Sequence, residues 1–215
     1  MYNILLSAAV LSACPNISPM SEFNTSEYIR STWFVQEQQI NGYQANNTLY
    51  CVAQTLNESS TYVPFFGGPV LSVYNYANID NVNGKPMNKD NFTLCARQVN
   101  SSRPSQILNG PCWLPNIFAG PYWVIDAGPS SYNYSWAIIS GGPPTVEYPD
   151  GNCSTSEKGV NGSGLWLLTR DNTVENVRYY VSLMRERLKM VGYTVSQLLP
   201  VKQTGCSYTG AFIKN

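Results

Sequence analysis

The chain has 215 residues, a formal net charge of zero and only 12% charged residues. This length fits one domain with a full core, and the low charge excludes the basic stripe that a nucleic-acid-binding protein needs. Histidine is absent, which excludes Ser-His-Asp and Cys-His catalysis and histidine-ligated metal sites within this chain. The composition is instead rich in aromatic residues, at 13%. These proportions favour binding over catalysis, because pockets for small ligands are mostly apolar.

The first residues are typical of an export signal. Ile4–Ala13 is an apolar run too short to span a bilayer, although no Lys or Arg precedes it. We predict a signal peptide at residues 1–13 and a lead-in to the domain at residues 14–30. Leu11–Cys14 also resembles the box that precedes the lipidated cysteine of bacterial lipoproteins. A lipid on Cys14 would leave one other cysteine unpaired. No transmembrane segment is predicted elsewhere.

Short segments rich in β-branched and aromatic residues, separated by Gly and Pro clusters, predict strands along the chain. We place eight strands at about 32–40, 48–56, 70–77, 82–87, 92–98, 122–127, 134–140 and 165–170. A long loop, 100–120, contains three prolines, and a second, 141–163, is rich in Pro and Gly. Eight strands with these spacings predict an all-β fold, a closed antiparallel up-and-down barrel without exposed sheet edges.

The last regular element is predicted to be an amphipathic helix that packs outside the barrel. An apolar stripe is formed by residues spaced three and four apart, namely Val174, Val177, Val181, Met184, Leu188 and Val191. Asn172 or Thr173 can cap the start of this helix, and Gly192 stands where a C-terminal cap belongs. We therefore expect one C-terminal helix that covers one side of the sheet.

In these features the sequence resembles the lipocalins, a family of eight-stranded barrels with one external helix that carry small hydrophobic molecules. Ser31–Phe34 matches the family's Gly-x-Trp motif with Ser in place of Gly, and Tyr132–Ile138 matches its second motif loosely. Arg170 matches the third motif, an Arg at the end of the last strand. The resemblance implies that Arg170 lies over Trp33 in a cation–π contact at the barrel floor, so both residues are expected to be structural.

The resemblance covers about residues 31–208, which we take as the lipocalin domain, and leaves residues 209–215 as a tail. It is clearest from Gly120 onward. The segments Pro121–Asp126 and Leu165–Leu168 are most similar to plant, algal and bacterial lipocalins and to the lipocalin domain of violaxanthin de-epoxidase.

Six cysteines, none in a CxxC pattern, indicate an oxidising compartment and argue against zinc or thioredoxin-type chemistry. Sequence alone cannot choose among the pairings. In many secreted lipocalins a second-strand cysteine is tied to the C-terminal tail, which implies Cys51–Cys206. The same family pattern implies Cys14–Cys112 and Cys95–Cys153.

Nine Asn-x-Ser/Thr sequons lie along the chain, at Asn16, Asn24, Asn46, Asn57, Asn91, Asn100, Asn133, Asn152 and Asn161. They indicate N-linked sugar and a eukaryotic secretory route, the alternative being an Asn-rich surface without glycan. We expect a secreted protein or one in the lumen of the secretory pathway. Alternative destinations are a vacuole, an algal plastid lumen or, in a bacterium, the outer membrane as a lipoprotein.

Both long loops are predicted at one mouth of the barrel, where binding residues commonly lie. An eight-stranded barrel can hold one small ligand. The candidate ligand-binding residues are aromatic, namely Tyr43, Tyr74, Tyr76, Trp113, Phe118, Tyr122 and Trp136. Those in strands could equally face outward, because strand parity cannot be fixed from sequence. Trp113 and Phe118, in the long loop 100–120, either plug the core or line the entrance.

Asp126 is the candidate for catalysis. It ends an apolar run, and a carboxylate inside an apolar barrel would have a raised pKa and could act as a general acid. The similarity to violaxanthin de-epoxidase favours this idea, since epoxide opening needs a proton donor. The de-epoxidase's Cys-rich and acidic domains have no counterpart in this sequence. Otherwise Asp126 caps the turn at the end of its strand.

The sequence therefore predicts a secreted, disulfide-bonded lipocalin that binds and carries or sequesters a small hydrophobic ligand, with no cofactor and no metal. Plausible ligands are a fatty acid, a sterol, a retinoid, a carotenoid or another pigment. One alternative is a de-epoxidase-like or isomerase-like enzyme that uses Asp126. Another is a structural or interaction subunit whose barrel is filled by its own aromatic residues. A monomer, a homodimer and a larger complex are all compatible with the sequence.

Overall fold

The computed structural model describes residues 14–88 and 92–215. The predicted signal peptide and the sequon at Asn91 lie outside these residues. The helices and strands are α1 (Thr25–Tyr28), β1 (Trp33–Gln38), β2 (Tyr50–Ser59), β3 (Val70–Ile79), β4 (Lys85–Pro86), β5 (Thr93–Gln98), β6 (Gln106–Gly110), β7 (Gly120–Ser130), β8 (Asn133–Ser140), β9 (Val146–Glu147), β10 (Cys153–Ser154), β11 (Leu165–Thr169), α2 (Val174–Met190) and β12 (Leu199–Pro200). Two 3₁₀ turns, η1 (Asn46–Thr48) and η2 (Asn116–Phe118), lie in loops.

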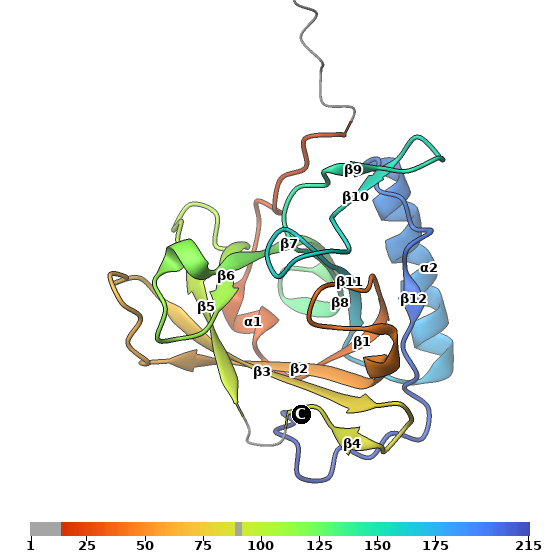
Figure 1. Ribbon diagram of the computed structural model, residues 1–215, viewed down its shortest axis with the longest axis horizontal. Coiled ribbons are helices and arrows are strands. Elements are labelled where there is room, and N and C mark those ends of the chain that lie inside the picture. Colours follow the sequence, from red (N-terminus) through yellow and green to blue (C-terminus); the bar gives the residue numbers. More distant parts are fainter. Residues whose placement is uncertain (1–13, 89–91) are drawn as a thin grey trace, which may run out of the picture.

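Eight strands close into an antiparallel barrel (Figure 1). Their order around the barrel is β1-β2-β3-β5-β6-β7-β8-β11, and β11 pairs with β1 to complete the ring. β4 extends only the end of β3, and β12 extends only the end of β1. The predicted all-β, up-and-down barrel with one C-terminal helix is therefore confirmed.

The predicted loop at 100–120 contains a barrel strand. β6 pairs with β5 on one side and with β7 on the other. The strand expected at 82–87 is reduced to the two residues of β4, so it is not one of the eight. β6 has the sequence Gln-Ile-Leu-Asn-Gly between Pro104 and Pro111, which carries little strand signal of its own.

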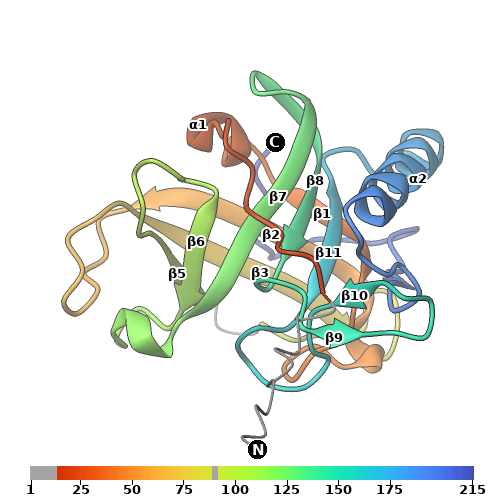
Figure 2. The same cartoon turned by 90° about the horizontal axis from the view of Figure 1, so that it is seen from above.

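Helix α2 lies outside the barrel, beside β8 and β11 (Figure 2). Met184 and Leu188 of the predicted stripe are fully buried, in a cluster with Ile138, Leu165 and Leu167 on the outer face of those strands. The stripe ends earlier than predicted, because Val191 is 45% exposed. The helix therefore covers one side of the barrel mainly with its C-terminal half.

The two ends of α2 are capped in different ways. Gly192 has a φ of 85°, the left-handed conformation that ends helices, as predicted. At the start, neither predicted capping side chain bonds the helix. Asp171 instead accepts hydrogen bonds from the backbone nitrogen of Thr173 at 2.7 Å and from Nδ2 of Asn176 at 2.6 Å.

Three disulfides join distant parts of the chain. They are Cys14–Cys153, Cys51–Cys206 and Cys95–Cys112. The predicted Cys51–Cys206 bond is confirmed, whereas Cys14–Cys112 and Cys95–Cys153 are wrong. Cys95 and Cys112 are partners because the missed strand β6 brings them together at the end of the β5–β6 hairpin. The sulfur of Cys14 is used in a disulfide with Cys153 in this structure, whereas the alternative prediction has it carry a lipid.

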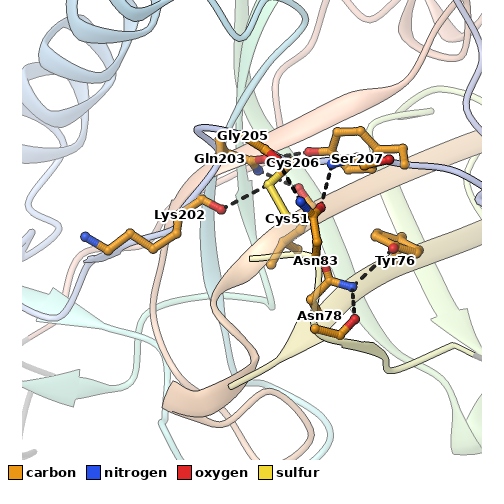
Figure 3. Close-up of a disulfide and its surroundings, with 12 residues drawn as sticks. Cys51, Tyr76, Asn78, Asn83, Lys202, Gln203, Gly205, Cys206 and Ser207 are labelled. Carbon is orange, nitrogen blue, oxygen red and sulfur yellow. Dashed lines mark hydrogen bonds between the residues drawn. A yellow bond between two sulfur atoms is a disulfide. The ribbon is translucent and has the colours of Figure 1, made fainter. Parts of the chain in front are cut away.

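The C-terminal tail after β12 crosses the outer face of β1, β2 and β3. Figure 3 shows the Cys51–Cys206 disulfide at this crossing. Beside it, Asn83 Nδ2 donates to the carbonyl oxygen of Gly205 at 2.9 Å, and Asn83 Oδ1 accepts from the backbone nitrogen of Ser207 at 2.6 Å (Figure 3). The tail therefore covers apolar side chains that the strands present to the outside.

Cross-strand register identifies the inner face of the barrel. Bulges shift the parity of β1, β2 and β7, so a simple alternation does not hold along these strands. The apolar residues that face inward and form the main core include Trp33, Val35, Leu56, Leu71, Val73, Ala96, Ile107, Val124, Ala137, Ile139 and Leu168. The core therefore fills the barrel rather than the space under α2.

Candidate ligand-binding site

Trp33 and Arg170 form the closed end of the barrel. The guanidinium carbon of Arg170 lies 3.5 Å from the centroid of the Trp33 ring. Arg170 also donates hydrogen bonds to the carbonyl oxygens of Ser31, Glu27 and Tyr28. Burial lowers the pKa of Arg170 to about 9, which still leaves the guanidinium charged at neutral pH. Its charge is therefore held against Trp33 and engaged by backbone oxygens.

A chain of hydrogen bonds crosses the interior next to this closed end. The hydroxyls of Tyr28 and Tyr122 lie 2.7 Å apart, and the Tyr122 hydroxyl donates to Gln54 Oε1 at 2.5 Å. Gln54 Nε2 donates to Asn75 Oδ1 at 2.9 Å. Because the proton of Tyr122 points to Gln54, Tyr28 must donate to Tyr122. We call these four residues, Tyr28, Tyr122, Gln54 and Asn75, the polar crossbar.

Burial makes the interior unfavourable for a negative charge. It raises the pKa of the Tyr122 phenol well above 10, and nearby Tyr28 and Tyr43 raise it further. Desolvation also raises the pKa of Tyr43 to about 12, although this side chain is 45% exposed. Tyr43 lies on the β1–β2 connection, near enough to Tyr122 to raise the pKa of its phenol.

Four connections surround the mouth, and two that are neighbours around the barrel touch each other. The β1–β2 connection donates a hydrogen bond from Gly42 N to Gly159 O of the β8–β11 connection at 3.1 Å. A Cβ atom on Gly42 would collide with that oxygen, so the close approach requires glycine. Beneath this contact, Trp166 Nε1 donates to Gln44 Oε1 at 3.0 Å. The β1–β2 and β8–β11 connections are thus held together at the mouth.

Solved structures of other proteins share this architecture. No protein-family model and no curated protein sequence matches the chain. Among solved structures, the chain is similar to insecticyanin from the tobacco hornworm Manduca sexta, with a TM-score of 0.54, 14% identity and coverage of 89% of this chain and 87% of that one. It is also similar to Per a 4, a major allergen from cockroaches, with a TM-score of 0.53, 11% identity and coverage of 93% and 98%. The chain has the lipocalin fold. At these identities the comparison shows the fold alone.

The lipocalin barrel brings one of the predicted ligand-binding residues, Tyr122 of the crossbar, to its interior, whereas Tyr43 is 45% exposed on the β1–β2 connection. Tyr74 and Tyr76 face outward instead. Tyr76 packs on Tyr208 and Tyr74 on Phe212, with ring centroids 5.7 Å and 6.1 Å apart. These two strand residues therefore contact the C-terminal tail and do not line the interior.

Trp136, Trp113 and Phe118 also lie outside the interior. Trp136 faces α2, with the guanidinium of Arg187 at 5.1 Å from its ring. Trp113 and Phe118 are 62% and 55% exposed on the β6–β7 connection. Arg97 holds this connection by donating to carbonyl oxygens in and beside it. Trp113 and Phe118 are thus presented at the rim, and Trp136 lies under α2.

Asp126 also faces outward. Tyr122 and Val124 face inward, and strict alternation would place Asp126 with them. The bulge between Val124 and Asp126 reverses the parity, and the carboxylate forms an ion pair with Arg187 of α2, with 2.8 Å between Oδ2 and Nη1. The expectation that Asp126 could act inside the barrel is therefore wrong in its geometry.

The sequence analysis missed the inward-facing amides. Gln54 and Asn75 belong to the crossbar, while Gln38 and Asn109 lie on the same inner face, opposite Trp166 and Gly120 respectively. Gln38 is fully buried, and neither its Nε2 nor its Oε1 has a hydrogen-bond partner; Asn109 Oδ1 is also without one. Polar residues at alternate strand positions normally indicate the face of a strand that contacts solvent. The sequence pattern therefore predicted that these amides face outward.

Two cavities lie outside the barrel. One of about 300 Å³, lined by Ile125, Asp126 and Arg187 among others, lies beside the contact of α2 with β7 and β8. The other, of about 440 Å³, lies under the C-terminal tail and is lined by Ser72, Tyr74 and other residues. The strand residues of both cavities face outward, so neither cavity belongs to the barrel interior.

The sequons differ in accessibility. Asn16, Asn46, Asn100, Asn133 and Asn161 are exposed, whereas Asn24, Asn57 and Asn152 are partly buried. Asn24 Oδ1 caps α1 by accepting from Glu27 N, and Asn57 Oδ1 accepts from Lys214 Nζ. Over residues 14–88 and 92–215, no group of three or more acidic or cysteine side chains is arranged to hold a metal ion. No helix in these ranges has the length and apolar character to cross a membrane.

Proposed function

We propose that this protein binds a small hydrophobic molecule inside its barrel and carries or sequesters it after secretion. The observation that carries the proposal is the inner face of the barrel, which has apolar walls and a polar crossbar. Several inward-facing side chains keep accessible surface, namely Gln54, Asn75, Leu94, Asn109 and Trp166. Accessible surface on inward-facing residues indicates interior space that the protein does not fill.

Sequestration needs no catalytic group. Each Å² of apolar ligand surface that leaves water contributes about 25 cal/mol, so a ligand of modest size gains useful affinity from burial alone. The connections over the mouth would control entry. Three disulfides support an oxidising compartment, as expected for a secreted protein. A catalytic role for Asp126 is not part of this proposal, because its carboxylate points away from the barrel.

The test is native mass spectrometry on protein purified from secreting eukaryotic cells, combined with an absorption spectrum and solvent extraction of the same sample. We expect a co-purified lipid or chromophore close to one molecule per chain, or uptake of a neutral hydrophobic dye at that ratio. An empty protein that takes up no hydrophobic probe would contradict the proposal.

A second candidate is an interaction subunit whose barrel is filled by its own side chains. It is favoured by one observation: both cavities described above lie outside the barrel, and most inward-facing apolar residues are fully buried. In that case the exposed aromatic residues of the β6–β7 connection would bind a protein partner. The same native mass spectrum separates the two candidates, because only the carrier retains or takes up a ligand.

A further inference from the structure

We propose that the barrel selects uncharged ligands with a hydroxyl, carbonyl or amide group on an apolar body, and that it rejects carboxylates. The inference rests on the proposed function, because it concerns the same interior site. It narrows the candidate ligands to alcohols, ketones and amides and removes free fatty acids and other acids. The basis is that the inner face carries hydrogen-bonding groups but no charge.

The charged residues of the eight barrel strands are few and are kept off the interior. They are Glu37, Glu58, Arg97 and Asp126. Glu37 and Asp126 form ion pairs with arginines of α2 on the outside. Arg97 binds carbonyl oxygens on the outer face. Glu58 is on the strand side that faces inward, but it lies four residues beyond Gln54, which pairs with Trp33 at the closed end. Its side chain is therefore exposed to water outside the closed end and not enclosed by the barrel.

Among residues 14–88 and 92–215, neither end of the barrel directs a cation toward a ligand. At the closed end Arg170 is engaged by three carbonyl oxygens and by the ring of Trp33. At the mouth, Asp80, Lys85 and Lys158 of the described connections are exposed to water. A carboxylate drawn into the barrel would therefore lose its hydration without gaining an opposite charge, which is strongly unfavourable.

The polar crossbar can form hydrogen bonds with an uncharged polar group of a ligand. Tyr28 gives its proton to Tyr122, Tyr122 gives its proton to Gln54, and Gln54 donates to Asn75. Each side-chain amide carries two N–H donors, and the crossbar uses one of those of Gln54 and none of those of Asn75, so N–H groups remain as well as oxygen lone pairs. A hydroxyl or amide of a ligand can bond to both kinds of group and a carbonyl to the N–H groups, whereas the crossbar carries no positive charge to offset the lost hydration of a carboxylate. The raised pKa values of Tyr28 and Tyr122 reflect the same environment.

Gln38 gives an independent indication. It pairs with Trp166, whose ring packs on the main core, so its side chain lies on the inner face below the mouth. It is fully buried, and both polar atoms of its amide lack a partner. Buried polar groups are nearly always hydrogen-bonded, so we infer that a ligand group bonds to this amide. That group must accept a hydrogen bond from Nε2 and donate one to Oε1. A hydroxyl does both, whereas a carboxylate can only accept.

The experiment compares two probes that differ only in their head group, dodecan-1-ol and dodecanoate, as competitors of the neutral dye Nile red bound to the full chain at pH 7. We expect dodecan-1-ol to bind about tenfold or more tightly than dodecanoate. Gln38→Leu should reduce the affinity for dodecan-1-ol about threefold to tenfold. The matched control Gln36→Leu, on the outward side of the same strand, should leave that affinity unchanged.

A second variant keeps the inference testable by gain of binding. Asn75→Lys places a cation on the inner face at a position with accessible surface, and it should move the preference toward dodecanoate by about tenfold. If this variant does not fold, the relative affinities of the unmodified protein for dodecan-1-ol and dodecanoate still test the inference. Equal or tighter binding of dodecanoate to the unmodified protein would overturn the inference and leave the carrier function standing. Binding of neither the dye nor either competitor would overturn the proposed function and the inference with it.

Discussion

The polar crossbar predicts that two tyrosine-to-phenylalanine changes have unequal effects. Tyr28 stands at the donor end of the chain, so Tyr28→Phe removes one hydrogen bond and leaves Tyr122 still bonded to Gln54. Loss of one such bond costs about 1 kcal/mol of the free energy of unfolding. Tyr122→Phe removes both of its bonds and leaves the fully buried Tyr28 hydroxyl without a partner, which raises the expected cost to about 2–3 kcal/mol.

The assay is equilibrium unfolding in urea at pH 7, with Tyr132→Phe as the control because Tyr132 is 85% exposed. The double variant, with both crossbar tyrosines changed, should cost no more than Tyr122→Phe alone, since it removes the hydroxyl that the single change leaves unpaired. A Tyr28→Phe variant that is destabilised as much as Tyr122→Phe would refute the direction of the hydrogen-bond chain, and strictly additive effects would refute the coupling.

Three further results are expected. Replacing both Cys95 and Cys112 with Ala should lower the free energy of unfolding by about 3 kcal/mol in urea without reductant, because the bond closes a loop with a sequence separation of 17. Arg97→Met should lower it by about 2–4 kcal/mol through lost bonds to carbonyl oxygens, whereas Arg103→Met, at an exposed site, should not change it measurably. Burial raises the pKa of Tyr193 to about 12 from 10, so the stability that this difference contributes is complete below pH 10 and is lost between pH 10 and 12. The free energy of unfolding of Tyr193→Phe, plotted against pH, should therefore fall less steeply between pH 10 and 12 than that of the unmodified protein.

The barrel could be predicted because most of its strands and the C-terminal helix carry strong local patterns. β8 and β11 are short apolar runs between Gly and Pro clusters, and the motif residues Trp33 and Arg170 meet as the family resemblance implied. β6 could not be predicted, because five weakly patterned residues become a strand only through pairing with β5 and β7. The Cys95–Cys112 pairing depends on that strand, so it was missed for the same reason.

The site was harder to predict than the fold because side-chain direction depends on bulges. One extra residue before Asp126 turns its carboxylate from the interior to the surface. Tyr74 and Tyr76 have the composition of pocket residues, but their register places them under the C-terminal tail. The crossbar amides Gln54 and Asn75 resemble solvent-facing residues until tertiary pairing shows that they face each other inside. Whether these side chains face inward or outward is set by contacts between distant strands, and no local sequence pattern reveals it.

The central claim, that a ligand binds inside the barrel and not in an outer cavity, is tested most directly by filling each space in turn. Leu94→Trp adds bulk on the inner face, Ser72→Trp fills the cavity under the tail, and Ser18→Trp fills the cavity beside α2. Nile red binding is then measured for the three folded variants. The account predicts that Leu94→Trp alone abolishes binding. Retained binding in Leu94→Trp together with loss in either of the other two would contradict it.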